Sequence, residues 1–145
     1  MRYICLFLLL LSGCGQQPAP TMPAHVDPLL VPYFAKFTQY IGVRTDNISA
    51  GFVSLTLPRV GQCSLYDDGS RIIQIDPIYW AKIGDDLKEQ LVFHELGHCA
   101  MGLQHIKDVD ANNCPVSIMF PSVFGDTPCY INNKYRYYQE LELYK

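Results

Sequence analysis

The spacing of apolar residues along the chain predicts its helices and strands. Apolar residues recur every three or four positions, the spacing of a helix face, in residues 27–41, 85–101 and 132–145. In residues 48–57 they alternate with small or polar residues, which is typical of a strand. Residues 62–77 contain an Asp-Gly step, which favours a hairpin turn between two short strands. This pattern predicts an α+β fold: a small, twisted, mainly antiparallel sheet packed on one helix, with further helices at both ends of the domain.

The helix predicted at residues 85–101 has the clearest signals. Its first turn is acidic, and Gly102 follows its last residue, as is common where a helix ends. Between these ends, four apolar residues fall on one stripe: Leu87, Leu91, Val92 and Leu96. We expect this stripe to pack against the sheet.

The first residues have the layout of a secretory signal, because one Arg precedes the apolar run of residues 4–11. This run is shorter than the roughly 20 residues that a membrane-spanning helix needs. Leu11-Ser12-Gly13-Cys14 resembles the lipobox of bacterial lipoproteins, which implies cleavage after residue 13 and a lipid on the Cys14 thiol. Gly15 is not an Asp, which implies sorting to the outer membrane if the host is Gram-negative. We therefore expect a protein that a lipid anchors to the bacterial cell envelope.

Residues 14–27 separate this lipidation site from the domain. They are rich in Pro and lack apolar periodicity, which predicts a semi-extended tether. Residues 28–145 are enough for one domain and too few for two ordinary ones. The formal net charge is -3 and no run of Lys or Arg occurs, which argues against nucleic acid as a partner. We expect a monomer that contacts the membrane through its lipid.

Four cysteines lie beyond the signal and the lipidation site: Cys63, Cys99, Cys114 and Cys129. An even number in an exported chain favours two disulfides, although the sequence allows three connectivities. We favour Cys99 with Cys114, which would tie the end of the motif helix to the loop that follows, and Cys63 with Cys129. The alternative is that Cys99 and Cys114 are additional metal ligands.

His94-Glu95-Leu96-Gly97-His98 matches the pattern His-Glu-x-x-His inside the predicted helix. Residues four apart lie on the same helix face, so His94 and His98 can both reach one Zn²⁺ at about 2.0–2.1 Å. Glu95 is placed to take a proton from a water at the metal as general base. A catalytic zinc has three protein ligands and one open position, and His105 is available as the third. The pattern predicts a peptidase with one catalytic zinc ion.

His94–His105 followed by Ser117–Pro121 resembles the metzincin clan of zinc peptidases. The resemblance covers roughly residues 71–121 and implies that a glycine break turns the chain so that His105 binds the metal. It also implies that Met119 forms the Met-turn beneath the zinc. Residues 70–80 resemble the edge strand along which such enzymes hold an extended peptide or protein substrate by main-chain hydrogen bonds.

The spacing between the second histidine and the glycine differs from that of the clan. Three residues separate His98 from Gly102, where the clan has two. An added residue rotates the end of a helix by about 100°. We retain His105 as the third ligand, and four acidic residues remain as alternatives: Asp108, Asp110, Glu140 and Glu142. A glutamate ligand from the last helix would resemble the thermolysin-like clan instead.

Two further alternatives stay open. Pro121 stands where several metzincins have a tyrosine that stabilises the oxyanion, and Tyr130 could take that role. The chain could also be a non-catalytic envelope lipoprotein that binds zinc or a protein partner. Glu95 argues against this second alternative, because a structural zinc site needs no general base and usually has four protein ligands.

Overall fold

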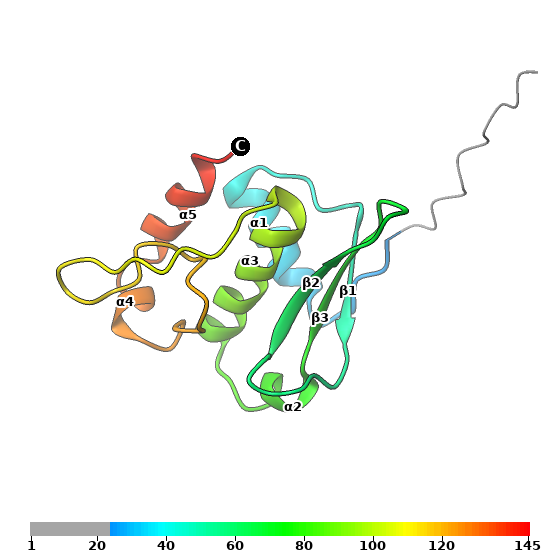
Figure 1. Ribbon diagram of the computed structural model, residues 1–145, viewed down its shortest axis with the longest axis horizontal. Helices are drawn as coiled ribbons and strands as arrows, with labels where there is room; N and C mark the ends of the chain where they lie inside the picture. Colours follow the sequence, from blue (N-terminus) through cyan, green and yellow to red (C-terminus); the bar gives the residue numbers. More distant parts are fainter. Residues whose placement is uncertain (1–23) are drawn as a thin grey trace, which may run out of the picture.

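A computed structural model describes residues 24–145 of the chain. The predicted signal (residues 1–13), the predicted lipidation site Cys14 and most of the predicted tether lie outside these residues. The described part is an α+β fold, as predicted, with a three-stranded sheet and several helices (Figure 1). In chain order its elements are α1 (Val31–Ile41), β1 (Ile48–Phe52), β2 (Gly61–Leu65), β3 (Arg71–Ile75), α2 (Pro77–Trp80), α3 (Asp85–Met101), α4 (Pro128–Ile131) and α5 (Lys134–Glu142).

The sheet has the strand order β1-β3-β2 and is mixed, which corrects the prediction of a mainly antiparallel sheet. β2 and β3 form the predicted antiparallel hairpin across the Asp-Gly turn. β1, however, lies on the other side of β3 and runs parallel to it. β3 is therefore the central strand, paired on both sides, and the expectation that residues 70–80 form an edge strand is wrong. The free edge on the hairpin side belongs to β2.

α3 has the bounds predicted from the sequence and lies between the sheet and α5 in Figure 1, with α1 packed against it. All four residues of the predicted stripe are buried. Burial extends well beyond that stripe, to Glu89, Gln90 and Phe93. Because elements cover α3 on several sides, its polar side chains need hydrogen-bond partners inside the protein.

α1 begins later than the apolar spacing suggested, whereas α5 begins where it was expected. α1 starts at Val31 rather than Asp27, because the residues before it form a turn in which Asp27 Oδ1 accepts the N–H of Leu29 at 2.9 Å. Pro32 occupies the first turn of α1, where a missing N–H costs no helix hydrogen bond. α5 follows Asn133, one of the two predicted starts.

The last residues of the predicted tether belong to the fold. Ala50 in β1 donates its N–H to His25 O at 2.8 Å and accepts the N–H of Asp27 at 2.9 Å. Val26 thereby forms a parallel bridge with Ala50. No helix in residues 24–145 has the length and apolar character needed to cross a membrane.

Glu89 is a buried carboxylate that connects α3 to three other helices. Its side chain accepts hydrogen bonds from Lys36, from Tyr138, from Tyr130 at 2.9 Å and from Lys134 at 3.1 Å. Burial acts to raise the pKa of Glu89, but these donors outweigh it and hold the pKa below its usual value. The ionised carboxylate therefore holds α1, α4 and α5 against α3.

Glu89→Ala is expected to lower the free energy of unfolding by about 3 kcal/mol, because it leaves several donors around a buried position without their acceptor. Since the folded pKa lies below the unfolded one, the stabilisation is present above the unfolded pKa and disappears as the pH falls through the folded pKa. Urea unfolding at pH 7 measures the loss of unfolding free energy, and the same measurement near pH 3 shows whether that loss becomes smaller at low pH. Glu142→Ala, at an exposed site in α5, is the control and is expected to change stability by less than about 0.5 kcal/mol. An equal effect of the two substitutions would contradict the role of Glu89.

Candidate metal centre

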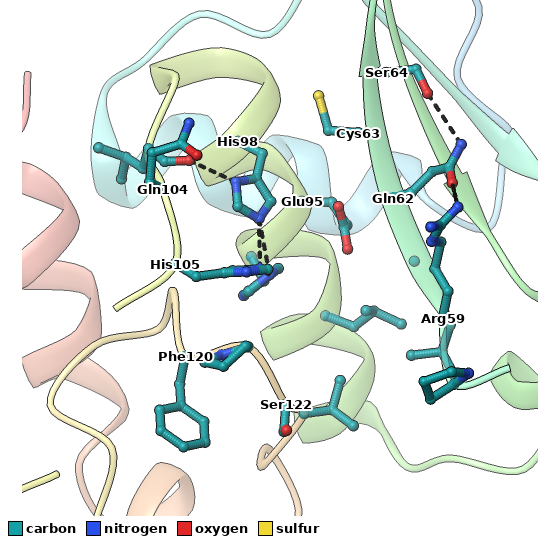
Figure 2. A pocket seen from close by; sticks show the side chains of 18 of the residues that line it. Arg59, Gln62, Cys63, Ser64, Glu95, His98, Gln104, His105, Phe120 and Ser122 are labelled. Carbon is teal, nitrogen blue, oxygen red and sulfur yellow. Dashed lines mark hydrogen bonds between the residues drawn. The ribbon is translucent and has the colours of Figure 1, made fainter. Parts of the chain in front are cut away.

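Three histidine side chains meet beside α3 (Figure 2). His94 and His98 lie one turn apart on the helix, and His105 comes from the segment that follows Gly102. The Nε2 atom of His98 lies 3.1 Å from that of His94 and 3.1 Å from that of His105. The Nε2 atoms of His94 and His105 lie 3.2 Å apart. The structure therefore brings together all three histidines that the sequence suggested as ligands.

Backbone carbonyls fix the protonation of two of these rings. His94 Nδ1–H donates to Ile118 O at 2.9 Å, and His98 Nδ1–H donates to Leu103 O at 2.6 Å. A carbonyl only accepts, so each Nδ1 carries the proton and each Nε2 of the neutral ring presents a lone pair. In this tautomer a cation between the two Nε2 atoms, which lie 3.1 Å apart, would accept a lone pair from each ring.

Burial favours the uncharged rings that bind metals. It lowers the pKa of His94 to about 4, against the hydrogen bond to Ile118 O, which acts to raise it. Burial also lowers the pKa of His105, and the neighbouring His98 and Lys107 act in the same direction. At neutral pH His94 and His105 are therefore uncharged and need lose no proton before they bind an ion.

The spacing of the three nitrogens fits a tetrahedral site. Ligands at about 2.0–2.1 Å from one tetrahedral ion lie about 3.3 Å from one another. The observed Nε2 separations of 3.1–3.2 Å are close to that value. No further His, Cys, Asp or Glu side chain of residues 24–145 joins the group, so three histidines would leave one position of a tetrahedron for a water or substrate. The three histidines can bind one metal ion.

Gly102 turns the chain so that His105 reaches the other two histidines. Its φ of 69° is in the left-handed region, which glycine adopts without strain. Gly102 N–H donates to His98 O, and Leu103 N–H donates to Gly97 O, both at 3.0 Å. These hydrogen bonds end α3 at Gly102. The third residue between His98 and Gly102 is part of the last helical turn and does not move His105 away from the other histidines.

Three of the four acidic alternatives to His105 have other partners, and the fourth, Asp108, is not part of the histidine group. Asp110 pairs with Arg136 and accepts two backbone N–H groups of its own loop, and Glu142 pairs with Lys145. Glu140 accepts Ser117 Oγ–H at 2.7 Å and the N–H of Ile118 at 3.1 Å. Because Ile118 O in turn accepts the proton of His94 Nδ1, Glu140 supports the orientation of a ligand ring. Sequence spacing gave no signal for this role.

Met119 is fully buried, and its neighbour Ile118 accepts the hydrogen bond of His94. A Cβ built on Gly97 would overlap its sulfur, so the glycine inside the His-Glu-x-x-His pattern makes room for Met119. Met119 O also accepts the N–H of Ile106 at 3.0 Å, which connects this turn to the segment that carries His105. Met119 therefore acts by packing against the motif helix, and its role as a Met-turn stays a prediction.

Glu95 lies between the histidines and β2, with its carboxylate facing the space between them (Figure 2). Only 4% of its surface is exposed. Burial raises the pKa of Glu95 to about 8, although a hydrogen bond from the backbone of Cys63 acts in the opposite direction. A carboxylate that titrates near neutral pH is suited to accept and release protons there, and a cation bound nearby lowers its pKa further.

A cleft of about 1340 Å³ lies over the histidines, and β2 forms one of its walls. Tyr66 donates its N–H to Ser70 O, and Val60 O accepts the N–H of Asp76, so alternate residues of this strand bond to β3. The residues in between turn their N–H and C=O groups away from β3: Gly61, Cys63, whose N–H donates to Glu95, and Leu65. This edge can pair with an extended chain inside the cleft.

The structure contains two disulfides, Cys63–Cys99 and Cys114–Cys129, so both predicted pairings are wrong. Cys63 on β2 faces the last turn of α3, whereas Cys114 and Cys129 connect the long loop to α4. The sequence could not show which strand lies beside α3, and this neighbour decides the pairing. Because Cys99 and Cys114 are in disulfides, the alternative that they bind the metal is also wrong.

Tyr130, the alternative group for stabilising the oxyanion, is fully buried and donates its hydroxyl to Glu89. This alternative is therefore wrong, since Tyr130 does not line the cleft.

Comparison of the chain with protein-family models, with curated proteins and with solved structures gave no match. The metzincin resemblance therefore depends on the motif residues alone, and a function has to be argued from the geometry of the site.

Proposed function

We propose that the protein is a zinc-dependent peptidase of metzincin type. The observation that supports this most is the convergence of three Nε2 atoms at 3.1–3.2 Å, with a buried carboxylate next to them and an open cleft above. In a site built for structure alone, four protein ligands usually surround the zinc. Here three histidines leave a position free, and Glu95 is the acid–base group beside it.

His94, His98 and His105 would hold the ion. When bound, zinc acts as a Lewis acid that lowers the pKa of a water and polarises a carbonyl group. Glu95 accepts a proton from the attacking water and delivers it to the nitrogen of the leaving amine. Burial of Glu95 strengthens its interactions with the reacting groups, because little water competes with them.

The substrate is an extended peptide, or an unfolded segment of a protein, that pairs with the free edge of β2. Gly61 and Leu65 supply main-chain donors and acceptors, and Cys63 supplies its carbonyl, because its N–H donates to Glu95. Main-chain pairing is independent of the substrate's side chains, so the walls of the cleft determine which sequences are cut. Peptides of the cell wall are candidates as well as proteins, because the proposed location is the envelope.

Cleavage of a diverse peptide library tests this function. The purified protein is incubated with zinc, then with a chelator, and then with zinc restored. The proposal requires cleavage that stops on chelation and returns with the metal. If the protein binds one zinc ion and cuts no peptide, it is instead a non-catalytic lipoprotein that binds zinc or a partner.

The envelope location is a separate part of the proposal, supported by the sequence around Cys14. Cells grown with labelled palmitate are expected to label the wild-type protein and not Cys14→Ser. Cys5→Ser is the matched control, because Cys5 lies within the residues that cleavage removes. Labelling that persists in Cys14→Ser would refute lipidation at this cysteine.

A further inference from the structure

β2 runs alongside the motif helix with matched spacing. The Cys63–Cys99 disulfide connects the two elements, with a Cα–Cα distance of 5.5 Å. Two residues of a strand advance about 6.7 Å, and four residues of a helix advance about 6 Å. The pair that faces next is therefore two residues before Cys63 on β2 and four residues before Cys99 on α3. That pair is Gly61 and Glu95. The disulfide thus sets a register that places Gly61 against the proposed general base.

Gly61 has no room for a side chain. A Cβ built on it would lie 2.6 Å from Glu95 Oε1 and 2.9 Å from Leu91 Cδ1. The backbone of Gly61 does not need glycine, because positive φ values among the described glycines occur at Gly42, Gly69 and Gly102. Lack of space is therefore the reason for this glycine. At Gly51 in β1, by contrast, a Cβ would have no neighbour within 4 Å.

We propose that Gly61 is a positioning residue for Glu95. By lacking a side chain, it lets the carboxylate lie between the histidines and the edge of β2. A methyl group at residue 61 pushes the carboxylate away from this place, and the buried surroundings of Glu95 leave few alternative positions. This inference rests on the proposed peptidase function.

Kinetics of Gly61→Ala and Gly51→Ala test the effect on catalysis. Gly61→Ala is expected to lower kcat at least about tenfold, because general-base catalysis depends on the position of the base, and to change KM less than about twofold. Zinc content is expected to stay at one ion per chain. Gly51→Ala, the matched control in the same sheet, is expected to keep wild-type kcat and KM. Wild-type kcat in Gly61→Ala would overturn the proposal.

A thermal-unfolding cycle tests the contact without using activity. It compares wild type, Gly61→Ala, Glu95→Ala and the double variant, all loaded with zinc. Gly61→Ala is expected to lower Tm by several degrees in the wild-type background and by much less when Glu95 is already alanine. Equal losses in both backgrounds would mean that Leu91 meets the new methyl, which overturns the proposal. If no form cleaves peptides, the proposed function fails, and this cycle alone decides whether Gly61 positions Glu95.

Discussion

Glu95→Gln is expected to lower kcat for peptide hydrolysis by about 10²–10⁴-fold, the usual contribution of a general base. Glutamine has nearly the same shape as glutamate but cannot accept the proton of the attacking water. Because His94, His98 and His105 stay in place, we expect the variant to keep one zinc ion per chain. Steady-state kinetics on the best peptide of the library, together with metal analysis, measure both quantities.

The control for this substitution is Glu142→Gln, at an exposed position of α5 far along the chain from the motif. It is expected to keep wild-type activity and zinc content. If Glu95→Gln retains more than about a tenth of the wild-type kcat with zinc bound, Glu95 is not the general base. Loss of zinc from this variant would show instead that Glu95 is a ligand.

His105→Ala has the second-largest expected effect. Removing a direct ligand is expected to weaken zinc binding by more than about 100-fold, since even hydrogen-bond partners of ligands contribute 10–100-fold. Peptidase activity is lost together with the metal. Zinc titration in competition with a chelator of known affinity gives the change directly.

His25→Ala is the matched control, because His25 is exposed and lies beside β1 rather than in the cluster. It is expected to bind zinc as the wild type does. If His105→Ala also binds zinc with wild-type affinity, the third ligand is a different group, and the geometry described above does not represent the metal-bound protein.

Local signals in the sequence predicted the parts of the fold that depend on neighbouring residues. The acidic first turn and Gly102 set the bounds of α3, and the Asp-Gly step predicted the β2–β3 hairpin. The proximity of His94 and His98 followed from the motif, because helix periodicity alone places these two side chains together. Each of these features is determined within a few residues of chain.

Contacts between distant residues could not be predicted in the same way. The order β1-β3-β2 depends on which edge of the hairpin β1 joins, and the apolar pattern of β1 fits either edge. The wrong edge strand follows from this ambiguity, whereas the wrong pairing of Cys63 arose because the sequence does not show which strand lies beside α3. Once β2 is known to lie beside α3, the pairing of Cys63 with Cys99 and the position of Gly61 against Glu95 both follow.

The position of His105 was the hardest to predict among the site residues, because the added residue before Gly102 rotates the end of the helix. The structure accommodates that residue in the final turn, where Gly102 and Leu103 donate to the carbonyls of His98 and Gly97. Segments after the turn then hold His105 in place, through the hydrogen bond between Ile106 and Met119. Motif spacing alone cannot show such a closure, since it depends on packing against the loop of residues 117–121.

X-ray absorption at the zinc edge, on the protein purified with one zinc ion per chain, tests the central claim most directly. We predict three nitrogen neighbours from imidazole rings and one oxygen neighbour, all at about 2.0–2.1 Å. His105→Ala prepared in the same way is predicted to lose the third imidazole contribution. Sulfur neighbours, a carboxylate in place of an imidazole, or four protein ligands with no open position would contradict the catalytic zinc site.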